Sequence, residues 1–93
     1  MWVYILRCSD NTLYVGQTSN VEERVQTHNA GEGPSYTATR RPVQVVYSEF
    51  CDSTQCARRR EKQIKRWSAE KKEALIASDF ARLYSLSRRR RFD

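Results

Sequence analysis

The sequence predicts an α+β fold: a small three-stranded, mainly antiparallel sheet flanked by about four helices. Two β-rich segments, residues 3–7 and 12–17, are separated by turn residues, and residues 43–50 form a third β-rich segment. Helix-capping patterns follow both the second and the third segment. A chain of 93 residues fits one small domain. We expect this domain to cover residues 1–84 and a basic C-terminal tail to cover residues 85–93.

The first two segments predict a β-hairpin. Ser9-Asp10-Asn11 is typical turn sequence and leaves a three-residue loop between the strands. This loop length pairs even-numbered residues with even-numbered residues, and directly opposed residues share a face of the sheet. Tyr4 and Tyr14 should therefore project from the same side. Gly16 lies on that side as well, where the lack of a side chain would let a ligand approach the backbone.

A helix should follow the hairpin. Two capping boxes fit its start, Ser19 with Glu22 or Asn20 with Glu23, and Gly31 is a signal for its end near residue 29.

Two polar residues of this helix are candidates for chemistry. Arg24 and His28 are four residues apart, which places them on one face, beside the apolar stripe of the helix.

Residues 31–42 contain two glycines, two prolines and two arginines, a composition that predicts neither helix nor strand. In the third strand, Val43, Val45 and Tyr47 are expected on one face. Its partner strand cannot be named, because no hairpin connects it to the first two strands.

Three more helices are expected toward the C-terminus. The first extends to about residue 67, the second covers residues 69–77, and the third follows with Phe80, Leu83 and Tyr84 facing inward. Their candidate capping residues are Asp52 or Ser53, Ser68 and Asp79.

Glu61 stands out in the first of these helices. It is four residues after Ala57 and three before Ile64, so a carboxylate lies within the buried stripe of a cation-rich helix. Desolvating a lone carboxylate is costly, so Glu61 needs a partner. A neighbouring cation could pair with it, or it could bind a metal, since Mg²⁺ often uses one or two protein carboxylates plus substrate phosphates. The cations within reach are Arg58, Lys62 and Lys65.

The charge of the chain favours a polyanionic partner. Seventeen Lys and Arg stand against eleven Asp and Glu, a formal net charge of +6. Such an excess suits DNA, RNA or an acidic membrane surface. Eight of the seventeen lie between Arg58 and Lys72, where a solvated helix face is the alternative explanation.

The three cysteines, Cys8, Cys51 and Cys56, lack a CxxC spacing, and His28 is the only histidine. Neither a disulfide scaffold nor a zinc site is expected. There is no run of 18 apolar residues, so no membrane span is expected and the predicted location is the cytoplasm.

Taken together, these segments resemble the GIY-YIG nuclease superfamily, and in particular its small stand-alone bacterial members. Trp2-Val3-Tyr4 stands where that family has Gly-Ile-Tyr, and Tyr14-Val15-Gly16 where it has Tyr-Ile-Gly. Arg24 and His28 match the family's Arg-x-x-x-His pattern, and Glu61 resembles its metal-binding glutamate. The resemblance covers residues 2 to about 83.

The resemblance implies a metal-dependent endonuclease that hydrolyses phosphodiester bonds, with a role in DNA repair or recombination. Glu61 would hold one divalent cation, Mg²⁺ or Mn²⁺, and Arg24 would hold the scissile phosphate. A tyrosine, which we assign as Tyr4, would orient or deprotonate the attacking water. His28 would share or relay the proton, and Tyr14 would position the water or the phosphate.

The expected partner is double-stranded or branched DNA. Charge does not separate RNA from DNA, and a protein partner remains open. The residues expected to contact the nucleic acid are Gly16, Gln17, Tyr36, Arg40, Arg41, Arg58, Lys62 and Lys65. Gln17 departs from the family, where many members have Lys. An alternative function is therefore a nucleic-acid-binding module of the same fold with little or no cleavage activity.

Overall fold

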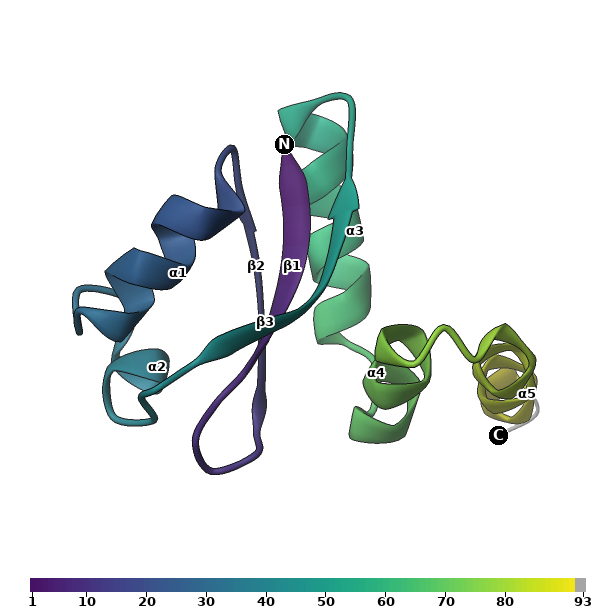
Figure 1. The fold of residues 1–93 in the computed structure, drawn as a ribbon. Helices are drawn as coiled ribbons and strands as arrows, with labels where there is room; N and C mark the ends of the chain where they lie inside the picture. The colour runs from purple at the N-terminus through teal and green to yellow at the C-terminus, as the bar shows by residue number, and fades with distance from the viewer. Residues whose placement is uncertain (92–93) are drawn as a thin grey trace.

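A three-stranded antiparallel sheet forms the centre of the computed structural model, which describes residues 1–91 (Figure 1). The strands are β1 (Trp2–Arg7), β2 (Leu13–Thr18) and β3 (Gln44–Phe50), in the spatial order β2-β1-β3. The strand whose partner the sequence left open thus pairs with β1, so β1 is the central strand. The fold class predicted from the sequence is confirmed.

The β1–β2 hairpin has the predicted three-residue loop. Cys8 N–H donates to the Thr12 carbonyl at 2.9 Å, and Asn11 adopts a left-handed φ of 71° within the loop. Asparagine tolerates this conformation better than most residues. In the resulting register Tyr4 faces Gly16 and Leu6 faces Tyr14, so even-numbered residues share one face of the sheet.

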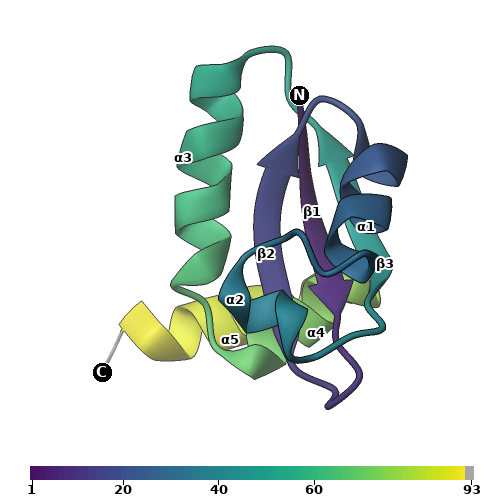
Figure 2. The same cartoon turned by 90° about the vertical axis from the view of Figure 1, so that its left-hand side faces the viewer.

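Helices cover both faces of the sheet. Figures 1 and 2 show α1 (Val21–Asn29) and the short α2 (Ser35–Ala38) on one side, and α3 (Thr54–Lys65) on the other. Helix α4 (Ala69–Ile76) packs near β3, and α5 (Phe80–Arg91) packs against α4. No helix among the described residues is long and apolar enough to span a membrane.

Two apolar clusters hold these layers together. On the α3 side, odd-numbered residues such as Val3 and Ile5 pack against Ala57 and Ile64. On the α1 side, the even-numbered residues Tyr4, Leu6 and Cys8 form a cluster with Val43, and Tyr14 and Val25 pack against it. The strand period of two thus sends one set of side chains to each core.

The ends of α1 follow the second of the two predicted capping schemes. Asn20 is the N-cap, and its Oδ1 accepts from the Glu23 N–H at 3.1 Å. At the other end, Gly31 has φ 82° and donates to the His28 carbonyl, while Glu32 donates to the Thr27 carbonyl. This is a Schellman motif, and it directs the chain back toward the sheet.

Three details differ from the sequence-based expectations. The loop of residues 31–42 contains one helical turn, α2, which accounts for a fifth helix. A β-bulge opposite Ile5 and Leu6 puts Val45 and Tyr47 on opposite faces of the sheet, because the extra residue shifts the alternation. Phe80 and Tyr84 are both 64% exposed instead of facing inward.

Helix α5 continues through residue 91, across the boundary placed after residue 84. The last two residues of the predicted tail lie outside the described residues.

Candidate active site

Tyr4 lies over the backbone of Gly16. The tyrosine side chain is fully buried, and a Cβ at Gly16 would lie 2.5 Å from Tyr4 Oη and 2.7 Å from Tyr4 Cζ. Gly16 therefore makes room for a protein side chain, whereas the sequence suggested room for a ligand. The hairpin register places this glycine directly opposite Tyr4, so the two residues form one unit.

The Tyr4 hydroxyl contacts the imidazole of His28, which α1 brings over the sheet. Tyr4 Oη and His28 Nε2 are 3.3 Å apart, and both side chains are fully buried. On the other side of the ring, His28 Nδ1 lies 2.8 Å from the Oγ1 of Thr37 in α2. Thr37 in turn donates to the Pro34 carbonyl at 3.1 Å. These contacts form a buried chain of hydrogen bonds from β1 through α1 to α2.

Two charged side chains, those of Arg24 and Glu61, shift the pKa of the Tyr4 hydroxyl. Burial raises the pKa of Tyr4 above its ordinary value, whereas a hydrogen bond from Arg24 lowers it; the nearby Tyr14 and Glu61 add to the rise. The other four predicted catalytic residues therefore all bear on the Tyr4 hydroxyl: His28 contacts it, and Tyr14, Arg24 and Glu61 shift its pKa. Together with Tyr4, they come from β1, β2, α1 and α3.

Burial also lowers the pKa of His28, and the positive charge of Arg24 lowers it further. The imidazole is therefore neutral at pH 7, and one of its ring nitrogens is free to accept a proton.

Tyr14 differs from Tyr4 in being partly exposed. Its ring meets the His28 ring at a centroid distance of 5.3 Å and the Tyr36 ring at 6.2 Å. Tyr36 is 37% exposed. Tyr14 and Tyr36 are thus the aromatic residues of this region that a substrate can reach.

Glu61 projects from α3 and is largely shielded, with 18% of its side chain exposed. Its Oε1 pairs with Lys65 Nζ at 3.2 Å, so one of the predicted local partners is present. Lys65 is the only hydrogen-bond or ion-pair partner of Glu61 among the described residues.

No group of three or more acidic, histidine or cysteine ligands occurs among the described residues. A single carboxylate whose one partner is an exposed lysine fits a divalent cation only when substrate phosphate and water complete its coordination, which is the usual arrangement for Mg²⁺. The donor set therefore fits a cation bound together with the substrate.

The predicted nucleic-acid contacts fall into two groups. The first group consists of two arginines whose side chains already interact with other parts of the protein. Arg40 stacks over Tyr36 at 4.0 Å and pairs with Asp10 at 3.0 Å. Arg41 donates to the carbonyls of Asn29 and Ala38. These two arginines hold the loop of residues 31–42 in place.

Gln17 also points away from the tyrosines. It lies opposite Val3 in the sheet, on the face that α3 covers, and its Oε1 is buried without a hydrogen-bond partner among the described residues.

In the second group, Arg58, Lys62 and Lys65 are exposed along α3. Among the described residues, Arg58 and Lys62 have no ion-pair or hydrogen-bond partner, and Lys65 is the neighbour of Glu61. Unpaired like charges on neighbouring turns of a helix repel one another, and a bound polyanion removes that repulsion.

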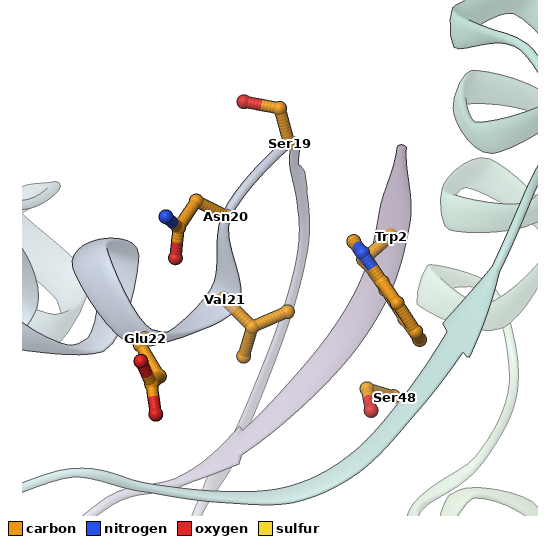
Figure 3. A pocket seen from close by; sticks show the side chains of 6 residues that line it. All are labelled: Trp2, Ser19, Asn20, Val21, Glu22 and Ser48. Carbon is orange, nitrogen blue, oxygen red and sulfur yellow. The ribbon is translucent and has the colours of Figure 1, made fainter.

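A separate pocket of about 400 Å³ lies between the start of α1 and strands β1 and β3 (Figure 3). None of the predicted catalytic residues lines it. Its lining residues are Trp2, Ser19, Asn20, Val21, Glu22 and Ser48.

Two residues of the site were not anticipated from the sequence. Thr37 contacts His28, and Gly33 leaves room for that contact, since a Cβ there would lie 2.6 Å from His28 Nδ1 and 3.0 Å from Thr37 Oγ1. Both lie in a segment that looked irregular, and no periodicity in it marks Thr37 as buried. The only signal was the glycine itself.

This arrangement of two tyrosines, an arginine, a histidine and a glutamate on an α+β domain agrees with the comparison with known proteins. The family described as the GIY-YIG catalytic domain matches residues 1–74, and the chain belongs to this family. Membership indicates a nuclease-type function.

More specifically, the chain is similar to UPF0213 proteins. It is 53% identical over 75 residues to one from Staphylococcus haemolyticus, covering 81% of this chain and 92% of that protein. A UPF0213 protein from Natronomonas pharaonis is 51% identical over 78 residues, with 84% and 92% covered. The solution NMR structure of a UPF0213 protein from Bacillus halodurans has a TM-score of 0.54 and 38% identity, covering 82% of this chain and 81% of that one.

Proposed function

We propose that the protein is a metal-dependent endonuclease that hydrolyses phosphodiester bonds in DNA, with repair or recombination as its setting. The observation that carries this proposal is the convergence on one tyrosine hydroxyl. His28 contacts the Tyr4 hydroxyl at 3.3 Å, and the charges of Arg24 and Glu61 both act on it. A proton acceptor, a phosphate-binding cation and a metal-binding carboxylate are the groups that such a hydrolysis requires.

Each group has a distinct part in the proposed reaction. A divalent cation held by Glu61 and the substrate phosphate would stabilise negative charge on the phosphate oxygens. The Arg24 guanidinium binds the same phosphate and stabilises the charge of the transition state. Tyr14, which is partly exposed, positions the attacking water.

The proton of that water passes through Tyr4. As the water oxygen bonds to phosphorus, its proton moves to Tyr4 Oη, and the tyrosine proton moves to His28 Nε2. The bond from phosphorus to the leaving oxygen breaks, and that oxygen takes a proton from solvent. Tyr4 never becomes a free phenolate in this scheme, so the raised pKa of its hydroxyl is no obstacle.

The scheme requires one rearrangement when substrate binds. Tyr4 is fully buried, whereas Arg24, which lowers the pKa of its hydroxyl, is exposed. Movement of Arg24 onto the phosphate uncovers the hydroxyl for the attacking water. The substrate thereby completes the site that cleaves it.

The proposal is tested by incubating purified protein with supercoiled plasmid, single-stranded DNA and branched DNA, with Mg²⁺, Mn²⁺ or EDTA. We expect nicks or breaks with either metal and none with EDTA. Gel-shift assays in EDTA report binding separately. Cutting that persists in EDTA would contradict the metal dependence.

The alternative function, a DNA-binding module with little cleavage, is favoured by Gln17. Its amide lies on the α3 side of the sheet and adds no charge beside the tyrosines. If none of the substrates is cut while salt-sensitive binding persists, this alternative replaces the nuclease.

DNA binding should depend on the exposed cations of α3. Replacing both Arg58 and Lys62 with Gln should weaken binding to unrelated DNA sequences equally, because phosphate contacts carry no sequence information. The slope of log K against log salt should become shallower by about 0.9 for each phosphate that the variant no longer neutralises. Fluorescence anisotropy at several salt concentrations measures this slope. Arg82→Gln is the matched control, since Arg82 is an exposed cation already paired with Glu70 at 3.2 Å; an equal effect of that change would contradict the assignment to α3.

The rate of cleavage should fall at acid pH, because protonated His28 cannot accept the Tyr4 proton. Burial and Arg24 lower the pKa of His28, so the midpoint of this fall should lie below about 6.5, the ordinary value for histidine. Single-turnover rates between pH 5 and pH 8 would locate it, with circular dichroism as a check on folding. His28 is the only histidine, so an NMR titration of the free protein reports its pKa directly, and that pKa should also lie below 6.5. A midpoint above 6.5 would contradict the proposed proton transfer.

A further inference from the structure

The hydroxyl of Thr37 has only one way to satisfy its contacts. Both contacts are hydrogen bonds only if its proton goes to the carbonyl of Pro34 at 3.1 Å, an oxygen that can only accept and that also accepts the N–H groups of Thr37 and Ala38. The contact between Thr37 Oγ1 and His28 Nδ1 at 2.8 Å must then use a proton carried by Nδ1. Since a neutral imidazole carries one ring proton, Nε2 is bare and accepts the Tyr4 hydroxyl at 3.3 Å.

The position of the ring proton matters because only the Nδ1–H tautomer leaves Nε2 able to accept a proton from Tyr4. With the proton on Nε2, His28 would donate to Tyr4 Oη and could take no proton from it. A neutral imidazole in water favours the Nε2–H form, and the partner of the other ring nitrogen decides which form a protein holds. Thr37 is the partner that the structure provides.

The surroundings leave no room for a substitute partner. His28 and Thr37 are both fully buried, and the backbone of Gly33 lies directly against their contact. A Cβ added at Gly33 would lie only 2.6 Å from His28 Nδ1 and 3.0 Å from Thr37 Oγ1. Water therefore does not replace the threonine hydroxyl while the side chain keeps its volume.

We propose that Thr37 is a positioning residue that holds His28 in the Nδ1–H tautomer, so that Nε2 can take the Tyr4 proton. The catalytic part of this inference rests on the proposed nuclease function. The tautomer itself does not depend on that function, so the two can fail separately.

The experiment is long-range ¹H–¹⁵N NMR of the imidazole at pH 7.5, in the wild type and in two variants. His28 is the only histidine, so its signals need no assignment by mutation. Thr37→Val keeps the branched shape and removes the hydroxyl, whereas Thr37→Ser keeps the hydroxyl. We expect Nδ1–H in the wild type and in Thr37→Ser, and a shift toward Nε2–H in Thr37→Val.

A wild type with Nε2–H or with a charged imidazolium at this pH overturns the proposal, and this measurement does not require any variant to fold. Retention of Nδ1–H in a folded Thr37→Val protein overturns it as well.

Cleavage supplies a second readout. Loss of general acid–base assistance costs about 10²–10⁴-fold in rate, so kcat of Thr37→Val should fall at least tenfold with DNA binding unchanged, and Thr37→Ser should recover most of the rate. If the wild type cuts no DNA, the nuclease proposal fails while the NMR result still decides the role of Thr37 in holding the tautomer. If the tautomer shifts in Thr37→Val and its kcat stays at the wild-type value, the catalytic part of the inference is overturned.

Discussion

Replacing Glu61 with Gln should lower the rate of DNA cleavage by about a thousandfold or more. Among the described residues, this carboxylate is the one that acts on the Tyr4 hydroxyl, and its one ion-pair partner is the exposed Lys65. A bound cation supplies several kcal/mol of transition-state stabilisation, and about 4 kcal/mol corresponds to a thousandfold change. Single-turnover nicking of supercoiled plasmid at saturating Mg²⁺ measures the loss.

Measurements of stability and of DNA binding distinguish this loss of cleavage from damage to the fold. Glu61→Gln gives up only the pair with Lys65, whose side chain is 52% exposed, so the free energy of unfolding should change by no more than about 1 kcal/mol. Binding in EDTA should be unchanged or slightly tighter, since a negative charge is removed. Glu70→Gln, which breaks the exposed pair with Arg82, is the matched control and should cut normally. Full activity in Glu61→Gln would show that Glu61 is not the metal ligand.

Replacing Gly16 with Ala should destabilise the protein and disable the site together. The new Cβ would lie 2.5 Å from Tyr4 Oη, a distance that side chains do not tolerate, and the Tyr4 side chain is fully buried. Overpacking of this kind costs about 1–3 kcal/mol of unfolding free energy. A displacement of about 1 Å in a reacting group can lower the rate by about 10²-fold. Urea unfolding and plasmid nicking measure the two effects.

A double-mutant cycle tests whether the clash with Tyr4 is what destabilises the Gly16→Ala variant. In a Tyr4→Leu background the ring that meets the new Cβ is gone, so Gly16→Ala should cost less there than in the wild type. Residues in contact typically show couplings of about 0.5–3 kcal/mol. Equal costs in both backgrounds would indicate that the close approach to Tyr4 is not the reason for glycine at position 16.

Several features of the site could be predicted from the sequence because they follow from local periodicity. A three-residue loop brings Tyr4 and Tyr14 to one face of the hairpin, whatever the rest of the chain does. Helical spacing likewise puts Glu61 on the buried side of α3, and the structure leaves only 18% of its side chain exposed. These expectations depend on neighbours within one element or one turn.

Other features needed contacts between segments far apart in the chain. Arg24 and His28 share a helix face, yet Arg24 is exposed while His28 is fully buried, because Tyr4 and Thr37, from other segments of the chain, contact the His28 ring. The pairing of β3 with β1 is non-local as well, and the bulge beside Ile5 could not be read from the alternation of β3 alone.

The pair of tyrosine segments shows most clearly which features of the site follow from the sequence and which follow from tertiary packing. By itself, the sequence determined the hairpin register, the shared face of Tyr4 and Tyr14, and the glycine opposite Tyr4. Only the tertiary structure decided that Tyr4 is covered, that its hydroxyl meets His28, and that Thr37 holds the other side of the ring. The physical reason is that a strand period is set by the backbone. The partner of a buried polar atom, in contrast, is set by which distant segment packs against it.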